Sequence, residues 1–192
     1  MALKQLYIDL ETTGLTEGCA ILQIACIVVI NRKITRRFVI NMNPSTNHRI
    51  ERNGEFHQRH RTKNVLSQKR GFEKFIKELE IQVDKYKPKD KFHFIAFNAG
   101  FDSTFLRNWF LENKYNYFGS YFHNPALCLM QKAMWILQED RNELENYQLG
   151  TICEHVGIKI NKHKLHDGEY DIDISYQLDT RLDNLLKQKL NS

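Results

Sequence analysis

Hydrophobic and polar positions alternate along the first half of the chain in the manner of a sheet. Residues 3–10 alternate and are rich in Leu, Tyr and Ile, which predicts a strand that runs into a turn-forming cluster at Glu11-Thr12-Thr13-Gly14. Residues 21–30 form a near-continuous β-branched run, typical of a strand covered on both faces. Residues 37–41 follow a turn at 31–33, so we expect the chain to begin with three antiparallel strands.

Helical spacing replaces this alternation farther along. It indicates a helix carrying Phe72, Phe75, Ile76, Leu79 and Val83, which ends before an apolar strand over residues 93–97. Asn98-Ala99-Gly100 breaks that strand, and a second helix follows whose bulky residues are predicted to pack in the core: Phe101, Phe105, Leu106, Trp109 and Phe110. The order of helix and strand suggests a crossover connection.

Three further helices are predicted in the last third of the chain. One is expected to start at Pro125, capped by Asn124, and to run to about residue 138. A short one covers residues 149–156, and the last spans residues 166–189. With no repeat, linker or break in composition, the 192 residues are interpreted as a single domain over 1–192. The predicted fold class is α/β.

Composition describes a folded chain with a basic balance. Hydrophobic residues make up 42% and charged residues 27%, which argues against disorder, and the formal net charge is +5. Residues 31–70 hold eleven basic residues against two acidic ones, so a surface facing phosphates is one interpretation and a solvated face the other.

Cysteine spacing and hydropathy bear on the compartment. Cys19, Cys26, Cys128 and Cys153 show no CxxC spacing, so we expect free thiols, buried at Cys26 and Cys153, and neither a disulfide nor a zinc site. The longest apolar stretch is far shorter than a membrane helix, and Asp9 and Glu11 stand where a signal peptide would be apolar. The expectation is a cytoplasmic protein without a membrane partner.

A pair of carboxylates at the end of the first strand is the strongest chemical signal. Asp9 and Glu11 stand two residues apart in a strand and therefore share one face, where a divalent cation such as Mg²⁺ would offset their mutual repulsion. Asp102 follows the break at 98–100, at a strand end where α/β folds gather ligands. On the predicted last helix His166 and Asp171 are five residues apart, about 140° around the axis.

Three segments of the chain carry a resemblance to a known family. The segments Tyr7-Ile8-Asp9-Leu10-Glu11-Thr12-Thr13-Gly14-Leu15, Asn98-Ala99-Gly100-Phe101-Asp102 and His166-(four residues)-Asp171 are similar to the three motifs of DEDDh (DnaQ-like) 3′-to-5′ exonucleases, which include the proofreading epsilon subunit of bacterial DNA polymerase III. The likeness extends over about residues 3–178, with the motifs in the same order. It implies a ribonuclease H-like fold, with a mixed five-stranded sheet flanked by helices.

The resemblance also implies roles for individual residues. By motif position, two Mg²⁺ or Mn²⁺ ions would be held by Asp9, Glu11, Asp102 and Asp171, and His166 would be the general base. Thr12 would meet the terminal 3′-hydroxyl through its backbone, and Leu15 would wedge against the last bases. The implied partner is a single-stranded 3′ end, and a separate DNA polymerase stays open as a second partner. The implied product is a nucleoside 5′-monophosphate.

Two details qualify the third motif. A tyrosine-based sister class has Tyr four residues before the last Asp, where this chain has Asp167, so the histidine version fits better. The family usually has small and apolar residues between His and Asp, whereas this chain has Asp167-Gly168-Glu169-Tyr170, and Gly168 is a poor helix former. Asp173 is an alternative acid whose spacing from His166 does not match.

Three functions stay open on these grounds. The first is a metal-dependent exonuclease that shortens single-stranded DNA from its 3′ end. The second is an RNA-trimming exoribonuclease of the oligoribonuclease kind, because the same active site could hydrolyse a phosphodiester bond in either DNA or RNA. The third is a catalytically silent nucleic-acid-binding domain, against which the presence of all five candidate catalytic residues argues.

Overall fold

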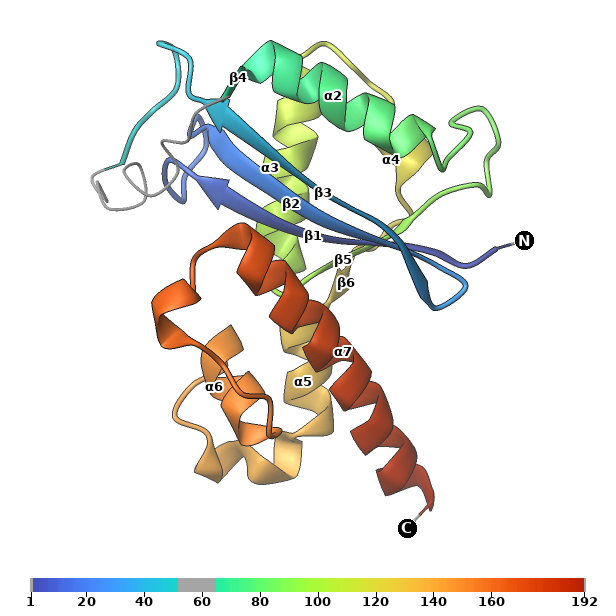
Figure 1. Cartoon of the computed structure of the whole chain (residues 1–192), viewed down its shortest axis with the longest axis vertical. Coiled ribbons are helices and arrows are strands. Elements are labelled where there is room, and N and C mark those ends of the chain that lie inside the picture. Colours follow the sequence, from blue (N-terminus) through green and yellow to red (C-terminus); the bar gives the residue numbers. More distant parts are fainter. Residues whose placement is uncertain (1, 52–64, 192) are drawn as a thin grey trace.

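A six-stranded mixed sheet forms the middle layer of the computed structural model, which describes residues 2–51 and 65–191 (Figure 1). The strand order is β4-β3-β2-β1-β5-β6. β1 pairs antiparallel with β2, and β2 with β3, whereas β5 lies parallel to β1. The strands are β1 Lys4–Thr12, β2 Ile21–Ile30, β3 Lys33–Asn43, β4 Leu66–Ser67, β5 His93–Ala96 and β6 Leu127–Cys128.

Helices cover both faces of this sheet. One side carries α2, α3 and α4, and the other carries α5, α6 and α7, with α7 running obliquely across the strands (Figure 1). The described helices are α2 Gln68–Glu80, α3 Ala99–Glu112, α4 Phe118–Tyr121, α5 Leu129–Ile136, α6 Leu149–His155 and α7 Gly168–Asn191, with 3-10 turns η1 Gln138–Glu143 and η2 Lys162–Lys164.

Alternation along β1 decides which side chains face each layer. Leu6, Ile8 and Leu10 pack into the large core under α2 and α3, whereas Tyr7 joins the smaller core beneath α7. Successive side chains of a strand point to opposite faces, so Asp9 and Glu11 share the α7 side with Tyr7. The sheet thereby presents its carboxylates to the last helix.

The predicted class, an α/β ribonuclease H-like fold with helices around a mixed sheet, is confirmed, although the sheet has six strands rather than five. Two of the six, β4 and β6, are only two residues long and add short parallel pairs at the sheet edges. The antiparallel start is confirmed, with β3 longer than predicted. Cys26 and Cys153 are buried, as expected.

Two predicted helix starts are wrong. The helix expected from Pro125 begins at Leu129, because Leu127 and Cys128 are extended and pair with Ile95 and Ala96 of β5. The last helix begins at Gly168 rather than residue 166.

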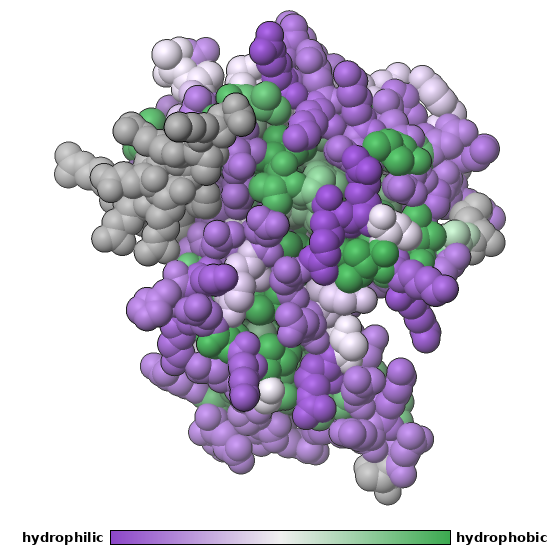
Figure 2. Space-filling model, in the orientation of Figure 1, coloured by the Kyte–Doolittle hydropathy of each residue, from purple (hydrophilic) through white to green (hydrophobic). Residues whose placement is uncertain are grey.

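The visible surface is mostly hydrophilic, and hydrophobic residues show through between the polar side chains (Figure 2). Within the described part of the chain, no helix has both the length and the apolar character that crossing a bilayer requires.

Candidate active site

Three carboxylates meet where β1 faces the start of α7. Asp9 and Glu11 come from the strand and Asp171 from the first turn of the helix, and one carboxylate oxygen from each lies within 4.8 Å of the other two. Glu11 is 7% exposed and Asp171 is 8% exposed, while Asp9 is half-buried. Residues 162 positions apart in sequence thus form one acidic cluster.

Asp171 has an oxygen without a protein partner. Its Oδ2 accepts a hydrogen bond of 2.9 Å from the backbone N–H of His166, but its Oδ1 is buried and has no hydrogen-bond partner. A buried carboxylate oxygen without a partner is costly unless a cation or a proton compensates it. Hard divalent cations such as Mg²⁺ prefer such oxygen ligands, so the donor set fits a metal of that class.

The pKa values of the buried carboxyl groups reflect the same crowding. Burial, followed by the charges of Asp102, Glu11 and Asp171, raises the pKa of Asp9 well above its usual range. Burial raises the pKa of Asp171 to about 6 and that of Asp102 to about 7. Desolvation of this kind disfavours the charged carboxylate, and a nearby cation would reverse the shift.

Asp102 stands at the edge of this cluster. It lies in the first turn of α3, where its Oδ1 accepts a hydrogen bond of 3.2 Å from the backbone N–H of Leu10. Its charge acts on Asp9, which places the two carboxyl groups close together, although Asp102 is not among the three whose oxygens lie within 4.8 Å. The structure therefore brings the fourth predicted ligand beside the other three.

His166 lies just before α7, and the predicted 140° separation from Asp171 on one helix is wrong. Its backbone φ is +68°, in the left-handed region that few residues other than glycine adopt. Asp167 ends the preceding turn and caps the helix, because its Oδ1 accepts hydrogen bonds from the backbone N–H groups of Glu169 at 3.1 Å and Tyr170 at 3.3 Å. His166 is exposed beside Asp171.

Asp173, the alternative acid, lies outside the cluster. Its side chain is 42% exposed and forms an ion pair with Arg37 of β3. Asp173 therefore pairs with the sheet outside the acidic cluster, whereas Asp171, which the spacing from His166 favoured, lies within it.

Gly168 and Gln23 support the site, and sequence reasoning did not identify either role. The Gly168 N–H donates to Gln23 Oε1 at 3.1 Å, and Gln23 Nε2 donates to Asn41 Oδ1 at 2.8 Å. A Cβ on Gly168 would lie 2.6 Å from Gln23 Oε1 and 3.2 Å from Asp9 Oδ2. The available signal was the glycine itself, because a poor helix former at a helix start often marks a close approach of the backbone.

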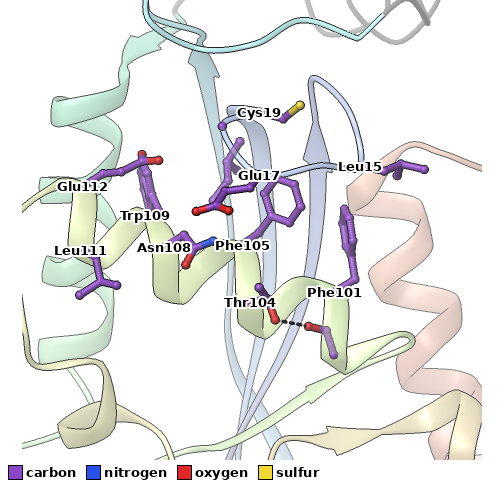
Figure 3. Close-up of a pocket in the computed structure, with 13 residues that line it drawn as sticks. Leu15, Glu17, Cys19, Phe101, Thr104, Phe105, Asn108, Trp109, Leu111 and Glu112 are labelled. Carbon is purple, nitrogen blue, oxygen red and sulfur yellow. Dashed lines mark hydrogen bonds between the residues drawn. The ribbon is translucent and has the colours of Figure 1, made fainter.

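A cleft of about 680 Å³ opens between the β1–β2 loop and α3, the helix whose first turn carries Asp102 (Figure 3). Leu15 of the loop and Phe101 and Phe105 of α3 line it, and the ring centroids of the two phenylalanines are 4.6 Å apart. These two rings were expected in the core but are only partly buried, while Leu106 packs inside. Thr12, the other predicted substrate contact, donates its hydroxyl to the Gly14 carbonyl at 2.6 Å.

Comparison with known proteins identifies relatives of this arrangement. The family model RNase_T, described as Exonuclease, matches residues 6–178. No curated protein matches the chain by sequence.

Solved structures share the fold at low sequence identity. The chain superimposes on E. coli Exonuclease I in complex with a dT13 oligonucleotide with a TM-score of 0.71 and 17% identity, over 98% of this chain and 43% of that one. It also resembles the nuclease domain of 3′hExo, a DEDDh family member bound to rAMP (TM-score 0.68, 16% identity, covering 94% and 92%). A third neighbour is cell-death related nuclease 4 (0.68, 16%, covering 95% and 64%). The chain thus spans less than half the length of Exonuclease I.

Proposed function

The chain belongs to the RNase_T exonuclease family, and from that premise we propose that it removes nucleotides from the 3′ end of single-stranded nucleic acid, DNA most of all. The proposed product is a nucleoside 5′-monophosphate, and the proposed unit is one exonuclease domain over residues 1–192. The observation that carries the proposal is the acidic cluster with its buried Asp171 Oδ1, because a family exonuclease needs a divalent cation where that oxygen lies.

The residues of the cluster would hold Mg²⁺ or Mn²⁺. Asp9, Glu11 and Asp171 would supply the close ligand oxygens, and Asp102 would contribute from the start of α3. When two such ions are bound, they lower the pKa of a water and stabilise both the attacking and leaving oxygens in displacement at phosphorus. The helix start holds Asp171 rigidly for this purpose, because its Oδ2 is fixed by the His166 N–H.

His166 is the proposed general base. It lies two residues before α7, its backbone N–H donates to the Asp171 carboxylate, and the residue is exposed. An exposed imidazole can take a proton from water and pass it to solvent. We expect His166→Ala to lower the rate while leaving much of the metal binding intact.

The cleft lined by Leu15, Phe101 and Phe105 is the proposed seat of the last bases. Bases have apolar faces that stack on aromatic rings without regard to sequence, which suits an enzyme that acts on any 3′ end. Leu15 stands 75% exposed at the rim, in place to wedge between bases, and the backbone of Thr12 is the proposed contact of the 3′-hydroxyl.

RNA is the second candidate substrate. One structural neighbour was solved with dT13 and another with rAMP, so proteins of this fold have been solved with a deoxyribonucleotide and with a ribonucleotide. A DNA polymerase partner and a cytoplasmic location stay predictions from the sequence.

The proposal is tested on oligonucleotides labelled at the 5′ end, DNA and RNA of matched sequence, with Mg²⁺, Mn²⁺ or a chelator. We expect stepwise 3′ shortening that the chelator abolishes and that Asp171→Asn lowers at least about a hundredfold. Asp173→Asn is the matched control, because it removes the same charge two residues away without touching the cluster. A faster rate on RNA would identify RNA as the preferred substrate. No shortening of either polymer with either metal would contradict the exonuclease proposal and favour a catalytically silent nucleic-acid-binding domain.

A further inference from the structure

The loop between β1 and β2, which carries Leu15, is tied to residues 49–51 by its backbone. Thr13 and Ala20 close the base of the loop through the Thr13 N–H, which donates to the Ala20 carbonyl at 2.9 Å. The Glu51 N–H donates to the Thr13 carbonyl at 3.0 Å, and the Arg49 N–H donates to the Gly18 carbonyl at 2.8 Å. The loop therefore rests on a second segment instead of extending freely from the sheet.

The Glu51 carboxylate makes a further connection inside the loop. Its Oε2 accepts a hydrogen bond of 2.7 Å from the Leu15 N–H, and its Oε1 accepts one from the Thr16 hydroxyl. The Thr16 hydroxyl and the Leu15 N–H lower the pKa of Glu51 from its usual value. Charge-assisted bonds of this kind are stronger than neutral ones. Both carboxylate oxygens are thus engaged by the two residues at the tip of the loop.

Gly14 makes room for this contact. A Cβ at Gly14 would lie 2.4 Å from Glu51 Oε2 and 2.6 Å from its Cδ, far inside contact distance. The carboxylate can pass beneath the loop only because this position has no side chain.

Leu15 needs such support because packing does not provide it. The residue is 75% exposed, and its side chain stands on the rim of the cleft opposite the α3 phenylalanines (Figure 3). An exposed leucine is free to turn unless its backbone is held, and a binding group that is already ordered loses less entropy when the ligand arrives. The Glu51 carboxylate supplies that order through the Leu15 N–H.

We propose that Glu51 is a positioning residue for substrate: it holds the Leu15 loop in the orientation that engages the bases of a polynucleotide 3′ end. The inference rests on the proposed function, because it concerns how the same site distinguishes a chain of nucleotides from a single one. Within the described residues, the hydrogen bonds of Glu51 go to the Leu15 loop and none goes to the acidic cluster, so its effect falls on binding and alignment of the bases rather than on bond cleavage.

The test compares two substrates in Glu51→Ala: a short oligothymidylate, and the p-nitrophenyl ester of thymidine 5′-monophosphate, which has no second base. We expect kcat/KM on the oligonucleotide to fall about tenfold or more, since small misplacement of a substrate-positioning group is costly, and the ester to change less than about twofold. Glu73→Ala is the matched control, because it removes one exposed carboxylate from α2, away from the loop. Equal losses on both substrates, or no loss on either, would overturn the inference.

Two variants separate positioning from a general effect on folding. Glu51→Gln keeps an acceptor for the Leu15 N–H and can donate to the Thr16 hydroxyl, so it should restore most of the oligonucleotide activity. In a Leu15→Ala background, Glu51→Ala should lower kcat/KM on the oligonucleotide only a little further, because Glu51 acts through the Leu15 side chain, which that background lacks. Additive losses in the double variant would contradict the proposal.

Amide hydrogen exchange tests the anchoring without any activity. Exchange at Leu15 and Thr16 should be faster in Glu51→Ala than in the wild type and unchanged in Glu73→Ala. Unchanged exchange would overturn the inference even if the enzyme is active. If the wild-type protein cleaved neither substrate, the proposed function would fail, and exchange would still decide whether Glu51 holds the loop.

Discussion

Gly168 occupies a position where the start of a helix approaches a strand so closely that a Cβ would meet the end of the Gln23 side chain. Its N–H bonds to Gln23, and Asp9 lies close to the space that a Cβ would fill. An alanine in a helix is ordinarily more favourable than glycine by about 1 kcal/mol. Glycine at this position therefore lowers the intrinsic stability of the helix but permits the contact between the helix start and Gln23. The residue that weakens the helix is the one that lets it reach the carboxylates.

Gly168→Ala should therefore destabilise the protein, by about 1 to 3 kcal/mol, because the added methyl group must displace the Gln23 amide and break its bond with the backbone. Exonuclease activity should fall with it, since Asp171 is carried by the same turn. Urea unfolding measures the change. Gly119→Ala is the control, because nothing lies within 4 Å of a Cβ there; a Gly168 variant as stable as that control would show that Gln23 yields at no cost.

At the scale of elements, α7 delivers Asp171 and also fastens itself to the sheet. Directly after Asp171, Ile172 packs against the β1 and β2 side chains of the smaller core. Farther along, Asp179 accepts a hydrogen bond from the buried Tyr7 hydroxyl and forms an ion pair with Lys132 of α5. Burial and Asp179 raise the pKa of Tyr7, so its hydroxyl stays a donor. The three elements β1, α5 and α7 share this one carboxylate.

Asp179→Ala should lower the free energy of unfolding by about 3 kcal/mol, because it leaves the buried Tyr7 hydroxyl without its acceptor and removes the better-buried partner of Lys132. Asp183→Ala removes the other partner of Lys132, whose side chain is 56% exposed, and should cost less than about 1 kcal/mol. Chemical denaturation of both variants checks the difference. Equal losses would mean that the Tyr7 contact contributes nothing.

Local sequence pattern predicted the elements better than their starting points. The run at residues 21–30 matches β2 residue for residue, because alternation and β-branching are properties of the strand itself. The start of α5 was misplaced because Leu127 and Cys128 are drawn into a parallel pair with β5, a partner about thirty residues away that no local pattern reveals. His166 was placed on a helix because its left-handed backbone depends on the turn that Asp167 caps.

The site shows the same division. The motif residues Asp9, Glu11 and Asp171 come together as the resemblance implies. The two-residue spacing of Asp9 and Glu11 in a strand places both carboxylates on one face of the sheet. Gln23 and Glu51 were missed because each acts through hydrogen bonds to residues far along the chain: Gln23 to Gly168, and Glu51 to Leu15. Such contacts arise only once the sheet and its loops are assembled.

For the whole molecule, the raised carboxyl pKa values predict how stability changes with pH. Between about pH 4 and 7 these two carboxyl groups bind more protons in the folded protein than in the unfolded chain, because burial raises the pKa of Asp171 to about 6 and that of Asp102 to about 7 from an ordinary value of 3.8. Stability of the metal-free protein from these two groups should therefore be greatest at low pH and fall as pH rises through 6 and 7.

Mg²⁺ should act in the opposite direction, because it binds the ionised carboxylates. At pH 8 and about a hundred times its dissociation constant, it should raise Tm by about 5 to 10 °C, and at pH 5.5 by much less. Thermal unfolding with Mg²⁺ or chelator at the two pH values measures both effects. Asp171→Asn should reduce the pH dependence to the part that Asp102 contributes and abolish the Mg²⁺ effect; a Mg²⁺ shift that survives in this variant would place the ion elsewhere.

The separation of Asp9 from Asp171 along the chain has a consequence for the time at which the enzyme becomes active. The sheet residues leave the ribosome early, but the acidic cluster stays incomplete until the start of α7 has emerged and docked on β1. Domains generally fold as units, so the cluster forms only when α7 packs on the sheet. A chain that stops before Asp171 should therefore keep most of the sheet residues but lack the third carboxylate of the cluster, and with it the proposed metal site.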